Sequence, residues 1–541
     1  MRTRVDPAAS LLALWLAAAT AAWAHSPAES SHAHGASGKA PEQLGRVSFE
    51  NSCAAAVQPR FERAMALLHS FWWRECEQAF RQVLEHDPDC AVATWGLAAI
   101  LIGNPFAGGP SAAQIVQAQQ AIERGRAIGA KTERERMFIE AVAQYFGGAP
   151  ERAHAARMQS LADAVEGVAR RFPDDDEAQI FAALYRTVTQ DPTEQSFASA
   201  LRAAAVLEAQ SRKHPDHPGA AHYLIHSYDY PPIAARGLEA ARRYAEIAPS
   251  APHALHMPSH IFTRVGAWQD SVASNLRSAR VAEAEGDLED QLHAMDYLAY
   301  AYLQLAQDAA AQRVVEGARH VPRSASPGLG EAYARAAMPA RHAIERGAWK
   351  EAAQLQVQPT RFAFVDAFTH AARAIGAARS ADAAAAQRDA DALARIVDAL
   401  RAARNAYWAT EVEVQRLGAS AWIAFARGHR EAAIDLMRAA ADLEDTSEKH
   451  GVSPGRLVPA RELLGDMLLE SGQPAEALAQ YERAQVRDPN RFRSLHGAGQ
   501  AAAQAGRRDR ARHHFERLRD MADPGAQRPE LEHARRHLAS P

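Results

Sequence analysis

The stretch AAHYLIHSYDYPPIAARGLEAARRYAEIAPSAPHALHMPSHIFTRVGAW, residues 220–268, decides the fold that this sequence predicts. It holds two groups of histidines in equivalent positions, because His222 and His256 are 34 residues apart and so are His226 and His260. A fixed step of this length is typical of a repeated helix–turn–helix unit. Positions four apart lie on one face of a helix, so each unit is expected to direct two imidazoles the same way. Stacking the units would bring the four rings together.

The composition favours an array of helices over a sheet-based fold. The chain has 541 residues, more than one hydrophobic core usually supports, so a solenoid or two domains is expected. Alanine is abundant, and 48% hydrophobic with 23% charged residues suits short amphipathic helices. A net charge of −4 gives no electrostatic reason to expect nucleic acid as a partner.

The N-terminus has the pattern of a cleaved secretory leader. Arg2 and Arg4 precede an apolar run over residues 8–22, and Ala22-Trp23-Ala24 fits the small-residue cleavage pattern. Cleavage after Ala24 predicts a periplasmic or secreted protein that begins at His25. No later segment has the roughly 18 uninterrupted apolar residues of a membrane-spanning helix, so none is expected after cleavage.

The rest of the chain divides into segments that are expected to be helical. The predicted organisation is a signal peptide at 1–24, a flexible His-containing lead-in at 25–45, N-terminal helical repeats at 46–210, central His-rich repeats at 211–320, helical repeats at 321–455, and C-terminal repeats with a closing helix at 456–541. The lead-in is polar, rich in Ser, Ala, Gly and Pro, and lacks a helical apolar stripe. The C-terminal repeats have the clearest packing pattern, carried by Leu464, Gly465, Leu468, Ala477, Tyr481 and Ala484.

These features resemble the tetratricopeptide-repeat superfamily along most of the expected mature chain. The chain is more closely similar to exported bacterial proteins of that type with HxxxH and HxxHxxxH motifs. The motifs that carry this similarity are LLHSFWW (67–73), DPDCAVATWG (87–96), NPF (104–106), HYLIHSYDYP (222–231), HALHMPSHIFTRVGAW (253–268) and HAMDYLAYAYLQ (293–304). The resemblance implies an all-α, right-handed solenoid of helical hairpins with a concave groove. Fold alone does not define a function.

The same resemblance assigns histidines to the groove. Carried over to this chain, the groove positions hold His222, His226, His253, His256, His260 and His293, and also His69, Asp229 and Asp296. Pro258 falls inside one of these helices and is expected to kink it or shift its start, because proline lacks the N–H that a helix needs.

Histidines in such positions favour a metal site. Imidazoles at i and i+4 can converge on one ion, and helices packed roughly 8 to 10 Å apart can share it. Imidazole suits copper, zinc and iron and does not choose among them. Met257 would favour copper if it turned inward, whereas Asp229 or Asp296 would suit zinc or iron, or would orient an imidazole; His69 is a further candidate ligand.

Three functions are open at this point. The first is metal binding and handling, or assembly of a periplasmic metal protein. The second is a metal-free scaffold that binds a partner protein or peptide in the groove. The third is a metal-dependent oxidoreductase or hydrolase. The sequence has no G-x-S-x-G, Walker or H-E-x-x-H motif, which favours a role other than catalysis.

The cysteines predict one disulfide. In an oxidising compartment, three cysteines leave one thiol over. Cys53 lies just before the first helix of a predicted hairpin and Cys90 just after the second, so both fall at one end of it and are expected to pair. Cys76 occupies a small packing position and is expected to be a buried free thiol, with copper ligation as the alternative.

Overall fold

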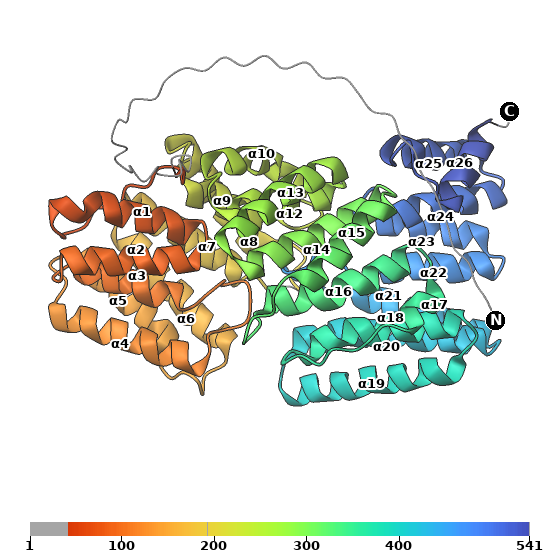
Figure 1. The fold of residues 1–541 in the computed structure, drawn as a ribbon, viewed down its shortest axis with the longest axis horizontal. Helices are drawn as coiled ribbons and strands as arrows, with labels where there is room; N and C mark the ends of the chain where they lie inside the picture. Colours follow the sequence, from red (N-terminus) through yellow and green to blue (C-terminus); the bar gives the residue numbers. More distant parts are fainter. Residues whose placement is uncertain (1–41, 192, 540–541) are drawn as a thin grey trace, which may run out of the picture. The chain divides into compact units, whose positions relative to one another are not determined.

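The computed structural model describes residues 42–191 and 193–539. The predicted leader and nearly all of the lead-in lie outside these residues. Within them the chain forms helices and loops and no strand, which confirms the all-α class. Figure 1 shows successive helices lying alongside one another as hairpins. None of the helices in this described part is both long enough and apolar enough to cross a membrane.

The helices that precede the central histidines form hairpins. They are η1 (Ala55–Val57), α1 (Gln58–His69), α2 (Trp73–His86), α3 (Ala91–Ile100), α4 (Ala112–Ile128), α5 (Glu133–Phe146), α6 (His154–Arg171), α7 (Asp176–Val188) and α8 (Ala198–Lys213). The Asp175 side chain accepts a hydrogen bond from the Ala178 N–H at the start of α7, as the acidic residues there predict.

The central helices carry the histidine-rich stretch. They are α9 (Pro218–Tyr228), η2 (Ala234–Gly237), α10 (Leu238–Ile247), α11 (Pro252–His256), α12 (Pro258–Val265), α13 (Trp268–Glu285), α14 (Leu288–Gln304), α15 (Asp308–His320) and α16 (Leu329–Glu345). The break between α11 and α12 falls at Pro258, as the missing N–H of proline predicts.

The remaining helices complete the array. They are α17 (Trp349–Ala353), α18 (Ala363–Arg379), α19 (Ala383–Ala402), α20 (Ala406–Ala426), α21 (Arg430–Glu444), α22 (Ala460–Glu470), α23 (Pro474–Arg487), α24 (Phe492–Gln504), α25 (Arg508–Met521) and α26 (Pro529–Ala539). A loop at residues 445–459 joins α21 to α22; it is called the 445–459 loop below.

Aromatic rings pack against glycines within the C-terminal hairpins. A Cβ atom placed on Gly465 of α22 would lie 2.8 Å from the Tyr481 ring of α23. The next hairpin repeats this contact, with 2.5 Å from a Cβ on Gly499 to the Phe515 ring. Only glycine lets an aromatic ring approach the neighbouring helix this closely. The helical-hairpin fold predicted from the sequence is thus confirmed.

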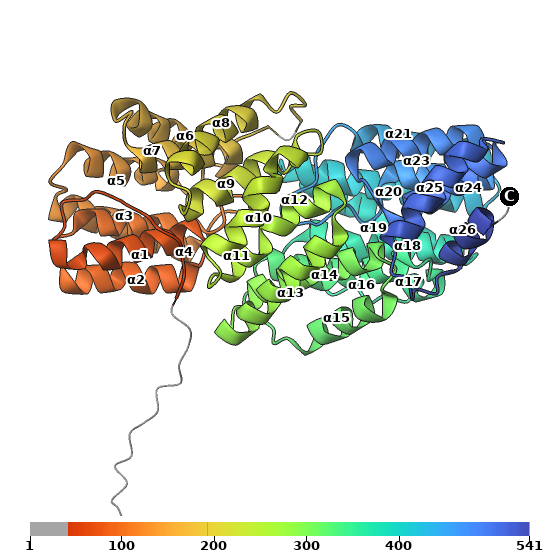
Figure 2. The ribbon, with the colours of Figure 1, turned by 90° about the horizontal axis from the view of Figure 1, so that it is seen from above.

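Long-range contacts join the C-terminal helices to the central ones. Buried Arg491, just before α24, donates hydrogen bonds to the Tyr300 hydroxyl and the Glu345 carboxylate, each at 2.6 Å, and to Glu462 at 3.0 Å. The indole N–H of Trp268 donates to the Asn490 carbonyl at 2.7 Å. In Figure 2 the central helices α9–α14 lie between α1–α8 and the later helices.

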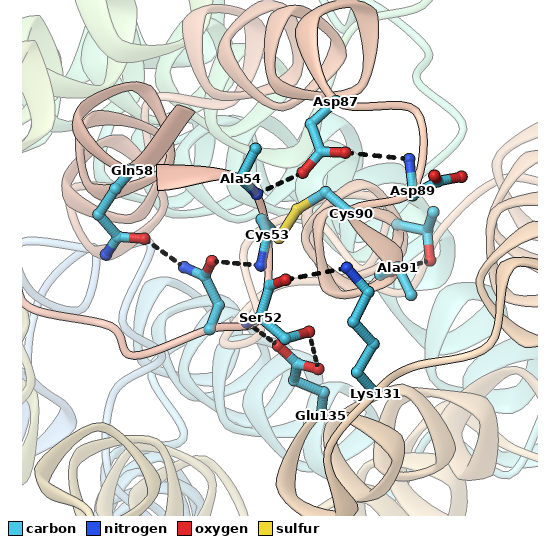
Figure 3. Close-up of a disulfide and its surroundings, with 12 residues drawn as sticks. Ser52, Cys53, Ala54, Gln58, Asp87, Asp89, Cys90, Ala91, Lys131 and Glu135 are labelled. Carbon is cyan, nitrogen blue, oxygen red and sulfur yellow. Dashed lines mark hydrogen bonds between the residues drawn. A yellow bond between two sulfur atoms is a disulfide. The ribbon is translucent and has the colours of Figure 1, made fainter. Parts of the chain in front are cut away.

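A disulfide joins Cys53 to Cys90 at one end of the α1–α2 hairpin (Figure 3). The two sulfur atoms are 1.96 Å apart. The adjacent Asp87 carboxylate accepts a hydrogen bond from the Ala54 N–H at 2.6 Å. Because the two sulfur atoms are bonded to each other, Cys53 and Cys90 are not available as metal ligands. Cys76 is a buried free thiol whose S–H donates to the Ala64 carbonyl.

Candidate metal centre

The first of two histidine triads consists of His222 and His226 on α9 and His253 on α11. Each offers one ring nitrogen, and these nitrogens lie within 4.8 Å of one another. His222 Nδ1 donates to the main-chain carbonyl of His69 at 2.6 Å, so its Nε2 carries the lone pair. The Nε2 atoms of all three rings are buried without a hydrogen-bond partner. Buried polar atoms are normally satisfied, and one metal ion would satisfy all three.

The second triad consists of His256 on α11, His260 on α12 and His293 on α14. Its ligand nitrogens also lie within 4.8 Å of one another. His253 and His256 are therefore only three residues apart yet belong to different triads. The sequence pattern placed His253, His256 and His260 in one group, whereas in the structure His253 joins His222 and His226, and His256 and His260 join His293.

Hydrogen bonds fix the tautomers of His256 and His260. His256 Nδ1 donates to Asn275 Oδ1 at 2.7 Å, and the orientation of that amide is set because its Nδ2 donates to the Ser271 carbonyl at 2.8 Å. His260 Nδ1 donates to Asp229 Oδ2 at 2.9 Å. With a hydrogen on each Nδ1, the neutral rings present lone pairs at both Nε2 atoms.

The two Nε2 atoms of His256 and His260 are only 3.1 Å apart. Two lone pairs at this separation repel each other unless a cation lies against both. Two nitrogen ligands of a tetrahedral metal, each about 2.05 Å from the ion, lie roughly 3.3 Å apart. The spacing of this pair is therefore close to that of two ligands on one metal ion.

Burial disfavours protonation of five of the six triad imidazoles, those of His222, His226, His256, His260 and His293. His222 has an exposed fraction of 0%, His256 of 1% and His226 of 7%. Burial lowers the pKa of His260, which the hydrogen bond from its ring to Asp229 partly offsets. Burial lowers the pKa well below the usual histidine range for His222, His226, His256 and His293. Neutral imidazole is the form that binds metals.

A buried charge network surrounds Asp229. Its carboxylate accepts hydrogen bonds from Arg264 Nε at 2.8 Å and from Lys449 Nζ at 3.4 Å, besides that from His260. Burial opposes ionisation of Asp229, but Lys449 and Arg264 hold its pKa well below the usual value. Burial in turn lowers the pKa of Lys449 to about 8. Asp229 therefore stays ionised and orients the His260 ring, a role that carboxylates often play beside metal-binding histidines.

Aromatic rings enclose the triads. Phe106, in the loop between α3 and α4, stacks on His226 with ring centroids 3.9 Å apart and an interplanar angle of 18°. Tyr297 meets His256 edge-on at 4.6 Å. Phe106 also lines a cleft of about 450 Å³, together with Tyr230 and Lys449. The Phe106 ring thus lies against His226, and the same residue lines the cleft.

A third group, formed by His69, Glu177 and His217, is satisfied internally. The Glu177 carboxylate contacts His69 Nε2 at 2.9 Å and His217 Nε2 at 2.8 Å. His69 Nδ1 bonds to the Tyr223 hydroxyl and His217 Nδ1 accepts from the Ala220 N–H. His69, a candidate ligand in the sequence, contributes to the first triad through its carbonyl, which holds His222.

Two further candidates have other surroundings. Met257 is fully buried in the hydrophobic core, where Ala254 and Ile261 also lie. Asp296 accepts a hydrogen bond from the buried Arg341 guanidinium of α16, so it serves an ion pair.

Residues distant in sequence complete the site. Asn275 lies on α13, two helices after the α11 helix of the histidine that it orients, and Lys449 comes from the 445–459 loop. No spacing pattern connects either residue to the histidine motifs. Phe106 belongs to the NPF motif, but the sequence gives no reason to place it on His226.

The triads do not line an open groove, contrary to the expectation from the resemblance. The hydroxyl of Tyr297 contacts the carbonyls of Gly451 and Ser453 in the 445–459 loop, at 3.2 and 3.0 Å. This loop also places Lys449 against Asp229. The central histidines are consequently buried, and a peptide could not lie across them in this conformation.

The chain has low sequence identity to the solved structures named below. No family model matches the chain, and no curated protein matches its sequence. Yeast Tom70 matches with 11% identity and a TM-score of 0.29 over 88% of each chain. Cut9–Hcn1 from the APC/C matches with 9% identity and a TM-score of 0.35, over 90% of this chain and 77% of Cut9–Hcn1. The human IFIT1 dimer with m7Gppp-AAAA matches with 13% identity and a TM-score of 0.34, over 80% of this chain and 90% of the IFIT1 chain. The fold assignment rests on the helices themselves.

Proposed function

We propose that the protein binds transition-metal ions through the two histidine triads, in order to handle metal or to assemble a metal protein. The observation that carries this proposal is the pair of Nε2 atoms of His256 and His260, 3.1 Å apart with both Nδ1 atoms engaged as donors. The secretory pattern at the N-terminus supports action in the periplasm or outside the cell.

The ligand set restricts the metal without selecting one. The triads consist of imidazoles, and neither a thiolate nor a carboxylate is among the six ligands. Copper, zinc and iron all accept such ligands, and geometry and availability then decide. The metal is expected to supply a positive charge that the ring nitrogens require, while the hydrogen bonds from Nδ1 atoms hold the rings in place.

Metal analysis of protein purified without a His-tag tests the proposal. After reconstitution separately with copper, zinc and iron, at least one metal should remain in stoichiometric amount through gel filtration. A His256→Ala, His260→Ala variant should lose the second site. His86→Ala is the matched control, because His86 is exposed on α2. Circular dichroism establishes that each variant is folded; protein that retains none of the three metals would refute the proposal.

A metal-free scaffold is the second candidate, and a separate cleft favours it. This cleft of about 750 Å³ is lined by residues that include Arg319, Arg323, Arg335, Arg361 and Phe362. Its guanidinium groups suit an acidic peptide. Binding of acidic peptides by metal-free protein, abolished in an Arg323→Ala, Arg361→Ala variant, would support this candidate; absence of binding would contradict it.

A further inference from the structure

The two triads repeat one construction. Each has a pair of histidines four residues apart, His222 with His226 and His256 with His260. Each is completed by a histidine from a later helix, His253 from α11 in the first triad and His293 from α14 in the second. In each triad the first histidine of the pair, His222 or His256, donates its Nδ1 hydrogen to a fixed acceptor.

The triads are also direct neighbours. The ring centroids of His226 and His260 are 5.7 Å apart, and those of His253 and His256 are 6.1 Å apart. Within the triads, His222 and His226 are 5.0 Å apart, and His260 and His293 are 6.4 Å apart. Separations between the triads thus fall in the range found inside them. Metal ions in the two triads would lie close to each other.

Two divalent ions at this place would need a negative ligand. Imidazole ligands bring no negative charge, and the ionised Asp229 is already paired with Arg264 and Lys449. The carboxylate of Asp290 approaches His253 Nδ1 at 3.7 Å. These groups leave most of the added positive charge uncompensated in a buried region, where charge is costly. A small anion between the ions would reduce their repulsion and complete both coordination shells.

We propose, on the basis of the metal binding proposed above, that the triads hold two ions as one dinuclear centre that takes a small bridging anion such as hydroxide or azide. Two-metal sites in proteins place their ions roughly 3.5 to 4 Å apart, a distance that one small ligand can bridge. The cleft that Phe106 lines is separated from His226 by the Phe106 ring, and Lys449 on its lining adds positive charge on the side from which an anion would approach.

Copper(II) is the probe that tests this centre, because its unpaired electron reports on a bridge between two ions. Reconstituted wild-type protein should hold two copper ions per chain. Its electron paramagnetic resonance signal should account for several-fold less spin than the copper content, because a bridging ligand couples the two electrons. Added azide should change the visible absorption of the copper protein.

Single-triad variants provide the matched controls. His222→Ala with His226→Ala, and separately His256→Ala with His260→Ala, should each hold one copper ion whose signal accounts for all the copper present. Wild-type protein with two copper ions and full spin intensity would overturn the dinuclear centre while leaving the metal-binding function intact. One copper per wild-type chain would also overturn it. No copper, zinc or iron bound would refute both proposals.

Discussion

The tautomers of His256 and His260 determine what the second triad can bind. Asn275 and Asp229 each accept a hydrogen from Nδ1, so the free lone pairs of both rings meet at Nε2. Imidazole protonation would relieve their repulsion, but burial lowers the pKa of both rings. A metal ion satisfies the two nitrogens without adding a proton to a buried ring.

Replacement of Asp229 tests how far the site depends on this hydrogen bonding. Asp229→Asn removes the charge that orients His260 and faces Arg264 and Lys449. We expect metal affinity to fall about 10- to 100-fold, as for other partners of metal-binding histidines. Competition titration with a chromophoric chelator measures this. Asp270→Asn on the exposed face of α13 is the control, and equal affinity in both variants would contradict the role of Asp229.

A histidine remote from the triads gives a pH-dependent prediction. Burial, with nearby His533 and Arg493, lowers the pKa of His496 to about 3. Below pH about 6.5 the unfolded chain binds a proton at this residue and the folded chain does not, so stability is lost as pH falls. The loss is up to about 1.4 kcal/mol for each pH unit below 6.5.

His496→Gln should remove this dependence. Between pH 7.5 and pH 5, its free energy of unfolding in urea should fall by about 2 kcal/mol less than that of the wild type. His86→Gln, at an exposed histidine, should behave like the wild type. Parallel losses in wild type and His496→Gln would show that His496 titrates alike in both states.

The sequence identified the triad histidines and named Asp229 as a residue that could orient one of them, which its hydrogen bond with His260 confirms, but it did not identify their other partners. The step between His222 and His256 follows from a repeated unit, and repetition is visible in a sequence. Which Nδ1 acceptor lies beside each ring depends on how neighbouring helices pack. Asn275 and the His69 carbonyl therefore had no signal in the sequence, and the carboxylate of Asp296, a candidate ligand in the sequence, pairs with Arg341.

At the scale of helices and loops, the break at Pro258 positions the second triad. His256 ends α11 and His260 lies in the first turn of α12. The Met257 N–H still donates to the His253 carbonyl at 2.9 Å, so the chain continues without a large turn. The sequence predicted a kink here, but not that His253 and His256, which both lie on α11, would belong to different triads.

The position of Phe106 in the α3–α4 loop predicts that its ring controls access from the adjoining cleft to the triads. Phe106→Ala would remove the ring that stacks on His226 and would open the triads to the adjoining cleft. We expect a small chelator such as EDTA to remove metal several-fold faster, with little change in equilibrium affinity. Stopped-flow absorption measures the rate. Phe172→Ala, another partly buried phenylalanine, is the control, and unchanged removal rates in Phe106→Ala would contradict a gate there.

At the scale of the whole molecule, segments far apart in sequence enclose the central helices. The 445–459 loop contacts Tyr297 and brings Lys449 to Asp229. Arg491 joins α14, α16 and α22 through its buried hydrogen bonds. The repeat pattern predicted the hairpins but could not predict these contacts, because the pattern describes neighbouring helices only. The repeat pattern therefore predicted an open groove, whereas the 445–459 loop covers the site in the structure.

Loss of Arg491 should destabilise these joined helices strongly. Arg491→Met removes the ion-pair partner of the buried Glu345 carboxylate and leaves buried Glu462 with Arg493 as its remaining ion pair. Breaking a buried ion pair in this way costs about 3 to 5 kcal/mol. Urea unfolding followed by circular dichroism measures it, with exposed Arg508→Met as the control. Similar stability of the two variants would show that Arg491 contributes little to this contact.

Anomalous X-ray diffraction from crystals of metal-reconstituted protein is the most direct measurement of whether the triads bind metal. Collected at the absorption edge of the metal that the protein retains, it should show a peak about 2.0 to 2.1 Å from Nε2 of both His256 and His260. A second peak is expected at the triad of His222, His226 and His253. Anomalous density confined to exposed histidines, with nothing at either triad, would contradict metal binding by this protein's central helices.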